Sequence, residues 1–196
     1  MFGSIQYNLA HLLDFRGRDA RQTFWYYVLF LVILRIIVAI GVSIPMIGGV
    51  MSQAMDAARS GVTDQQALTA SMLGSIGPWL HTAALISIVA GLVTTLLLLA
   101  SFVRRAHDSG NSGWWVALPL AAELFDLGLR YQNLSRIGQV LDQAAQQVQS
   151  GGAMNFTGQS SALGMIGWIA PLVLLVFGVM KSTDGPNRYG DEPVRF

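Results

Sequence analysis

Hydrophobic residues in this chain of 196 residues gather in four long stretches that polar segments separate. The four stretches are residues 24–44, 76–103, 114–129 and 161–180. A helix needs about 20 apolar residues to cross the hydrocarbon core of a bilayer, and each stretch approaches or exceeds that length. The pattern therefore predicts an all-α, polytopic membrane protein, a bundle of four transmembrane helices that forms a single membrane domain over residues 1–196.

Two long polar segments, 45–75 and 130–160, join the predicted spans on the outer side. Apolar residues recur every three or four positions within 132–150, which predicts an amphipathic helix in the last outer loop. Residues 46–75 are small and polar, and we expect only weak helix there. Near the N-terminus, Phe2, Ile5, Leu9 and Leu12 share one helical face, which predicts a short helix lying at the membrane interface.

The composition supports a membrane protein. Hydrophobic residues make up 53% of the chain and charged residues 12%, about half of the roughly 25% that is usual in soluble domains. So few polar side chains cannot cover a water-soluble globule. The chain has no cysteine, which excludes disulfides, thiol catalysis and thiolate metal sites.

Lysine and arginine are distributed unevenly between the two sides of the predicted bundle. The N-terminal segment, the short loop between spans two and three, and the tail carry eight of the twelve: Arg16, Arg18, Arg21, Arg104, Arg105, Lys181, Arg188 and Arg195. The outer loops carry three, Arg59, Arg130 and Arg136. Because basic residues favour the cytoplasmic side, the asymmetry predicts that both termini are cytoplasmic.

Three polar motifs fall on that cytoplasmic side. They read FRGRDARQTFWYY at 15–27, RRAHDSGNSGWW at 104–115 and KSTDGPNRYGDEP at 181–193. In this order and at span boundaries, they resemble the bacterial inner-membrane family known as domain of unknown function 805. The resemblance rests on Phe15, Gly17, Arg18, Arg21, Phe24, Trp25, Arg104, Arg105, His107, Asp108, Gly110, Ser112, Gly113, Trp114, Gly185, Asn187, Tyr189, Gly190, Asp191 and Pro193.

The resemblance implies a location in the bacterial inner (plasma) membrane, with several spans. It implies no activity, because the family has no established one to transfer. The chain also departs from the family: members often have an acidic residue just before the aromatic pair of the first motif, where this chain has Gln22 and Thr23. The two outer segments are longer than those of compact members, so the resemblance does not extend to their role.

The motif residues form the candidate binding site. Its members are Arg16, Arg18, Arg21, Arg104, Arg105, His107, Asp108, Asn187, Arg188, Tyr189 and Asp191. The simplest interpretation is that the basic residues follow the positive-inside rule and reach lipid phosphates. Alternatively, several guanidinium groups form a pocket for a phosphate or carboxylate, because their planar forks match such anions.

We expect the chain to be a noncatalytic binding or scaffold protein. Its expected partners are the lipid bilayer, anionic lipid headgroups and a membrane or cytoplasmic protein, with no nucleic acid. His107 and Asp108 are adjacent, but no third ligand or catalytic group is predicted beside them, so we expect no metal, no cofactor and no enzyme activity. A small transporter or channel is the second interpretation of the function, and an enzyme that acts on a membrane-bound anionic substrate is the third.

Charged residues also lie inside the predicted spans, where each one is costly unless it is paired. At about 1.5 Å per residue, Arg35 is roughly 16 Å deep, Glu123 roughly 14 Å and Asp126 roughly 18 Å. The similar depths predict that Arg35 pairs with Glu123 or Asp126, while Asp126 has an alternative partner in Arg130, four residues along. A small transporter or channel that uses this buried charge cluster is the alternative function.

Overall fold

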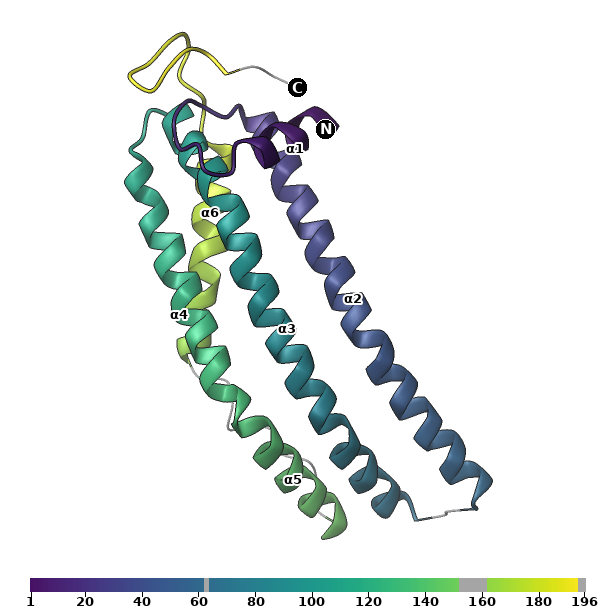
Figure 1. Cartoon of the computed structure of the whole chain (residues 1–196). Coiled ribbons are helices and arrows are strands. Elements are labelled where there is room, and N and C mark those ends of the chain that lie inside the picture. The colour runs from purple at the N-terminus through teal and green to yellow at the C-terminus, as the bar shows by residue number, and fades with distance from the viewer. Residues whose placement is uncertain (62–63, 152–161, 194–196) are drawn as a thin grey trace. The chain divides into compact units, whose positions relative to one another are not determined.

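The computed structural model describes residues 1–61, 64–151 and 162–193, and most of these residues are helical (Figure 1). The α-helices are α1 (Phe2–Ala10), α2 (Arg21–Arg59), α3 (Gln65–Asp108), α4 (Ala117–Leu134), α5 (Arg136–Gln149) and α6 (Ile169–Val179). The 3-10 helices η1 (Gly113–Val116) and η2 (Ala162–Trp168) precede α4 and α6. The described residues form no strand, only an isolated bridge between Asn187 and Gly190. The predicted all-α class is confirmed.

The chain divides into two compact units. Unit 1 contains Met1–Ile36, Ala90–Leu127 and Leu163–Phe196, and unit 2 contains Ile37–Val89 and Gly128–Ala162. Helices α2, α3 and α4 therefore each contribute to both units. All three motifs belong to unit 1.

Helices α2 and α3 extend well beyond the predicted spans 24–44 and 76–103. They have 39 and 44 residues, which at 1.5 Å per residue makes them about 58 and 66 Å long. The segment 46–75 is mostly helical instead of weakly helical, because it is rich in alanine, methionine and glutamine, which are good helix formers. Pro45 and Pro78 lie inside the helices without ending them.

Among the described residues, two helices are long and apolar enough to cross a membrane: Arg21–Arg59 and Ser71–Asp108. In the most apolar 18-residue stretch of each of these helices, only 11% of the residues are buried. The predicted spans 114–129 and 161–180 correspond to shorter elements. The first is covered by η1 and α4, and the last is interrupted because η2 occupies its first half and α6 has only 11 residues.

The core of unit 1 is aromatic. Phe24 of α2, Phe102 and Ala106 of α3, and Phe177 of α6 are buried against one another, and the rings of Phe102 and Phe177 meet edge to face. Gly178 lets α2 approach α6 closely, because a Cβ there would lie 2.5 Å from the Trp25 ring. The Trp25 indole also donates a hydrogen bond of 3.0 Å to the carbonyl oxygen of Gly178. These contacts hold the motif-bearing helix ends together.

Unit 2 contains the amphipathic helix that the sequence predicts in the last outer loop. Helix α5 buries Leu141 and Ala144, and a Cβ on Gly77 of α3 would lie 3.3 Å from the Leu141 side chain. The same unit also joins α3 to α2, because the Ser75 hydroxyl of α3 donates a hydrogen bond of 3.0 Å to Gln53 of α2. Helix α5 therefore packs with its apolar face on the outer part of α3.

Helix α1 confirms the predicted N-terminal helix, and it turns its apolar face outward. Ser4 and Asn8 are buried, whereas the Phe2 side chain is 81% exposed and Leu9 is also exposed. This orientation is the reverse of the one expected for a soluble amphipathic helix. Polar contacts therefore attach α1 to the rest of unit 1.

Candidate functional site

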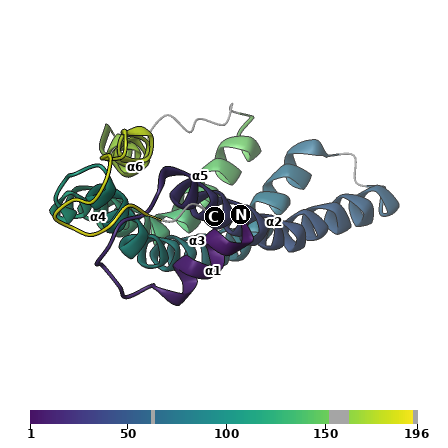
Figure 2. The same ribbon diagram turned by 90° about the horizontal axis from the view of Figure 1, so that it is seen from above.

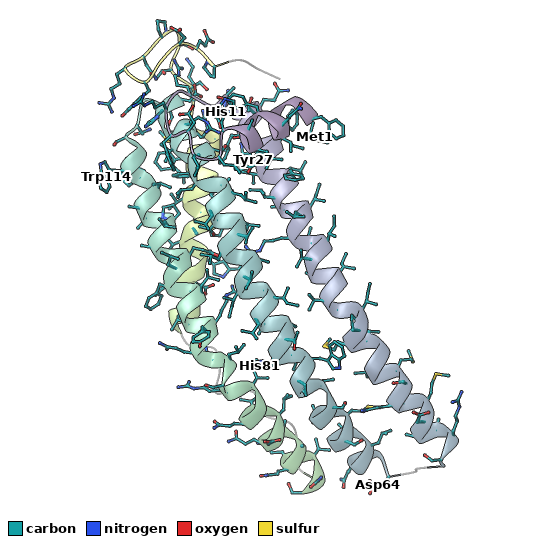
Figure 3. All side chains as sticks on the ribbon, in the orientation of Figure 1. Met1, His11, Tyr27, Asp64, His81 and Trp114 are labelled. Carbon is teal, nitrogen blue, oxygen red and sulfur yellow. The ribbon has the colours of Figure 1, made fainter. Side chains whose placement is uncertain are left out.

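The three sequence motifs meet at one end of unit 1, which we call the motif end. It consists of residues 1–21, 104–113 and 180–193. Figures 1 and 2 show α1 and the yellow tail after α6 gathered at the C-terminal end of α3. Figure 3 shows His11 and Trp114 at this end as well, with Trp114 pointing away from the helices. Glycine permits the sharp turn that follows α3, since Gly110 has φ +78°.

Arg18 and Asp108 connect the first motif to the second. Arg18 Nη2 lies 3.0 Å from Asp108 Oδ1, and both side chains are fully buried. The same guanidinium donates hydrogen bonds to the tail, at 2.7 Å to the Thr183 carbonyl oxygen and 2.6 Å to that of Gly185. The ion pair therefore joins the first two motifs, and the hydrogen bonds to the tail carbonyls join the third motif to them.

Arg105 connects the second motif to the end of α6. Its Nε donates a hydrogen bond of 3.0 Å to the Phe177 carbonyl oxygen, and its Nη2 donates to that of Met180. Carbonyl groups in the last turn of a helix have no partner within the helix, so Arg105 acts as a C-terminal cap for α6. Arg105 Nη1 also pairs with Asp108, whose second oxygen accepts a 2.5 Å hydrogen bond from Ser182.

Arg104 connects the second motif to α1. Its Nε lies 2.9 Å from Asp19 Oδ1, and its Nη2 donates a hydrogen bond of 2.7 Å to Asn8 Oδ1. Its Nη1 donates to the carbonyl oxygens of His11 and Asp14. The Asp19 carboxylate also accepts a 2.9 Å hydrogen bond from Ser101. One arginine therefore fixes the whole N-terminal segment.

These three arginines and two aspartates are almost free of solvent contact. Burial raises the pKa of the Asp19 carboxyl, while Arg104 and Ser101 act in the opposite direction. Burial lowers the pKa of the Arg105 guanidinium, and Asp108 partly offsets this effect. Because protein acceptors already surround Arg18, Arg104 and Arg105, these residues hold the fold together and present no guanidinium to an external anion.

His107, Tyr189 and Arg188 form a stack at the surface of the motif end. The rings of His107 and Tyr189 lie parallel with centroids 3.9 Å apart, and the Arg188 guanidinium lies 4.6 Å from the Tyr189 ring centroid. Asn187 adds a hydrogen bond of 3.0 Å to the His107 carbonyl oxygen. Burial lowers the pKa of His107, the hydrogen bond with the Gly17 carbonyl raises it, and the charge of Arg188 lowers it.

We expect acid to weaken this stack. A histidine whose pKa is lower in the folded chain than its ordinary value of 6.5 stabilises the fold above that pH, and the stabilisation is lost as the pH falls below it. The unfolding temperature of the wild type should therefore drop between pH 7 and pH 5. His107→Phe keeps a ring against Tyr189 but cannot titrate, so its unfolding temperature should change less. Parallel pH profiles for the two proteins would contradict a role of His107.

The remaining candidate residues are exposed. Arg16, Arg21, Arg188 and Asp191 all face solvent at the motif end, as does Lys181, which the candidate set did not include. Their charged groups are therefore open to an external partner. The structure thus divides the basic motif residues into a buried set and an exposed set, a division that spacing along the sequence does not reveal.

The charged residues of the predicted spans separate into two places within unit 1. Arg35 Nη2 and Glu123 Oε1 each lie 3.5 Å from the position that a Cβ on Gly91 would occupy. Both groups therefore converge on Gly91, although the part of the chain that the structure describes has no ion pair between them. Asp126 is buried, and its carboxylate lies against Gly167, just before α6, where a Cβ would be 2.9 Å from Oδ1.

The sequence did not identify several residues of the buried network. Asp19, Asn8 and Ser101 accept or donate the hydrogen bonds around Arg104 and its partner carboxylate. An acidic residue inside the arginine-rich first motif was the available signal, because arginines that become buried require carboxylates. Within residues 1–61, 64–151 and 162–193, no group of three His, Asp or Glu side chains is placed to hold a metal ion.

Comparison with known proteins identifies the family. Neither the curated proteins nor the solved structures that were compared contain a match to this chain. One family model, described as a protein of unknown function (DUF805), matches residues 12–191, which include the first two motifs and all but the last two residues of the third. The match covers nearly the whole sequence, and the chain therefore belongs to the DUF805 family.

Proposed function

We propose that this protein spans a bacterial inner membrane four times and binds the phosphate of lipid headgroups through the exposed basic residues of its motif end. The proposal places both termini in the cytoplasm and assigns the protein a noncatalytic role. The observation that carries it is the exposure of Arg16, Arg21, Lys181 and Arg188 at one end of unit 1. Clustered basic side chains at a membrane surface attract lipid phosphate.

The surfaces of the helices support a location in the membrane. The core helix of a soluble protein is mostly buried, whereas only 11% of the residues are buried in the most apolar stretches of α2 and α3. Leu29, Val32 and Ile36 are among the exposed apolar residues of α2. Hydrocarbon chains would cover such surfaces, and the 84% exposed side chain of Trp114 suits the interface between lipid and water.

The topology can be tested with reporter fusions. Reporters at Met1 and Phe196 should both report the cytoplasm, because eight of the twelve lysines and arginines fall on that side of the proposed arrangement. A reporter inserted near Gln146 should report the opposite side. If the two termini were found on opposite sides, the number of spans would be odd and the proposal would be wrong.

Lipid binding can be tested by native mass spectrometry of the whole purified chain. We expect phospholipids to remain bound more strongly than diacylglycerol, which lacks the phosphate, and added salt should weaken their retention. Replacing Arg16, Arg21, Lys181 and Arg188 together by glutamine should reduce retention to the level of diacylglycerol. Arg59→Gln is the control, since Arg59 is an exposed arginine of unit 2. Equal retention of both lipid types would contradict the proposal.

Transport is the second candidate, because Arg35 and Glu123 converge on Gly91. Ionisable side chains inside a span are a feature of proton and ion pathways. A proton flux into vesicles containing the protein, abolished by Glu123→Gln, would favour transport. The absence of such a flux would exclude proton transport.

A further inference from the structure

A small pocket opens at the motif end between the start of α2 and the tail. It has a volume of about 250 Å³. Ala20, Arg21 and Gln22 line one side, and residues between Lys181 and Pro193 line the other. The pocket is smaller than the roughly 300 to 1,000 Å³ of sites for drug-sized ligands, so it suits a compact polar group.

Charged residues of both signs line this pocket. Arg21 and Lys181 are basic, and Asp184 and Glu192 are acidic, so the formal charges of these four described lining residues balance. Lys181 Nζ lies 3.0 Å from Asp184 Oδ2, and both side chains are strongly exposed. Exposed pairs of this kind are held weakly, so each member can exchange its partner for a charged group of a ligand.

We propose that this pocket recognises a headgroup that carries a phosphate and a primary ammonium group, as phosphatidylethanolamine does. This inference rests on the proposed function, because it names the lipid that the motif end binds. Arg21 and Lys181 would contact the phosphate at the N-terminus of α2, where helix dipoles favour anions. Asp184 and Glu192 would accept hydrogen bonds from the ammonium group.

The lining of the pocket discriminates between headgroups. A choline headgroup has no N–H to donate, and the quaternary ammonium is usually held by aromatic rings. Among the residues that the structure describes, the pocket lining contains no aromatic side chain. A glycerol headgroup brings the phosphate charge but no ammonium, so Asp184 and Glu192 would face a net negative ligand. Phosphatidylethanolamine offers its phosphate to the two basic side chains and its ammonium group to the two acidic ones.

The position of the pocket places it at the level of lipid headgroups. Arg21 is the first residue of α2, and Lys181 comes two residues after α6 ends. The hydrogen bond between Trp25 and Gly178 joins these two helix ends. Trp25 is partly exposed beside them, and an indole in such a place is typical of the interface between lipid and water.

The inference can be tested by native mass spectrometry of the full chain with dioleoyl phosphatidylethanolamine, phosphatidylglycerol and phosphatidylcholine. The wild type should retain phosphatidylethanolamine about tenfold more tightly than either other lipid, the effect of a charge-assisted hydrogen bond. In the double variant Asp184→Asn, Glu192→Gln this preference should vanish while phospholipids still bind. Asp56→Asn removes another strongly exposed carboxylate of an i,i+3 pair, in unit 2, and should leave the preference unchanged.

The outcomes separate the inference from the proposed function. Equal or tighter binding of phosphatidylglycerol or phosphatidylcholine to the wild type would overturn the inference and leave phosphate binding intact. A preference for phosphatidylethanolamine that survives the double variant would also overturn it, because the carboxylates would then play no part. If none of the three lipids bound more tightly than diacylglycerol, the proposed function itself would fail. If the double variant does not fold, the comparison of lipids on the wild type still tests both the inference and the proposed function.

Discussion

Asp108→Asn should lower the free energy of unfolding by roughly 3 to 5 kcal/mol, because it removes the shared carboxylate of two buried guanidinium groups. Asp108 accepts from Arg18 through one oxygen and from Arg105 and Ser182 through the other. Asparagine has only one side-chain oxygen to accept these hydrogen bonds. Its NH₂ group would lie against the N–H or O–H donors on the other side and would repel them. Unfolding in mixed micelles titrated with SDS measures the loss.

The control is Asp56→Asn on α2. Asp56 is also an aspartate paired with an arginine, yet its side chain is 76% exposed, so we expect a loss below about 1 kcal/mol. The loss from Asp108→Asn should also show as faster hydrogen exchange in the tail, since Arg18 and Arg105 hold residues 180–185. Similar small losses for both variants would mean that water reaches Asp108 and solvates the two arginines.

The hydrophobic pattern predicted the class of fold and the approximate places of the helices. Apolar runs locate helices because their side chains must avoid water, and α2, α3, α4 and α6 all overlap predicted spans. The pattern could not locate the ends of α2 and α3. Beyond residue 44 and before residue 76, alanine, methionine and glutamine continue the helix in polar surroundings, and hydropathy does not measure this preference.

For the candidate site, the sequence predicted which motifs belong together but not which of their side chains are buried. Arg18 and Arg21 are three residues apart in the same motif, yet one is buried beside Asp108 and the other faces solvent. The difference depends on where the chain enters α2 and on the carbonyl groups that the tail brings to Arg18. Contacts between residues more than 160 positions apart leave no local pattern in a single sequence.

The similar depths predicted for Arg35, Glu123 and Asp126 did not indicate which neighbour each side chain approaches. Two of these groups converge on Gly91, where the missing side chain leaves room between helices. Asp126 is three residues after Glu123, but its carboxylate lies at Gly167, next to the first turn of α6. The N-terminal end of a helix favours a negative charge, so α6 gives Asp126 an environment that the sequence of α4 alone does not indicate.

Arg104→Met should detach α1 from unit 1 while the aromatic core remains packed. The guanidinium of Arg104 contacts Asp19, Asn8 and the carbonyl oxygens of His11 and Asp14. Methionine fills a similar space but leaves the Asp19 carboxylate buried without its cation, which costs roughly 3 to 5 kcal/mol. Helix α1 buries Ser4 and Asn8 and turns Phe2 and Leu9 outward, so its fully buried side chains are polar and supply no apolar packing to replace the lost hydrogen bonds.

Hydrogen exchange of the whole protein separates this local effect from general unfolding. Amides of residues 5–11 should exchange faster in Arg104→Met, whereas those around Phe102 and Phe177 should keep their protection, because the aromatic core does not include α1. The double variant Arg104→Met, Asp19→Leu should be more stable than Arg104→Met, because it no longer buries an unpaired carboxylate. Its α1 should still be detached, because Asn8 still lacks the donor that Arg104 provides. Arg104→Lys should give an intermediate result, because one ammonium group cannot reach four acceptors at once. If α1 kept its protection in Arg104→Met, its outward apolar face would have to be held by lipid, and the N-terminal helix would be anchored by the membrane instead of by Arg104.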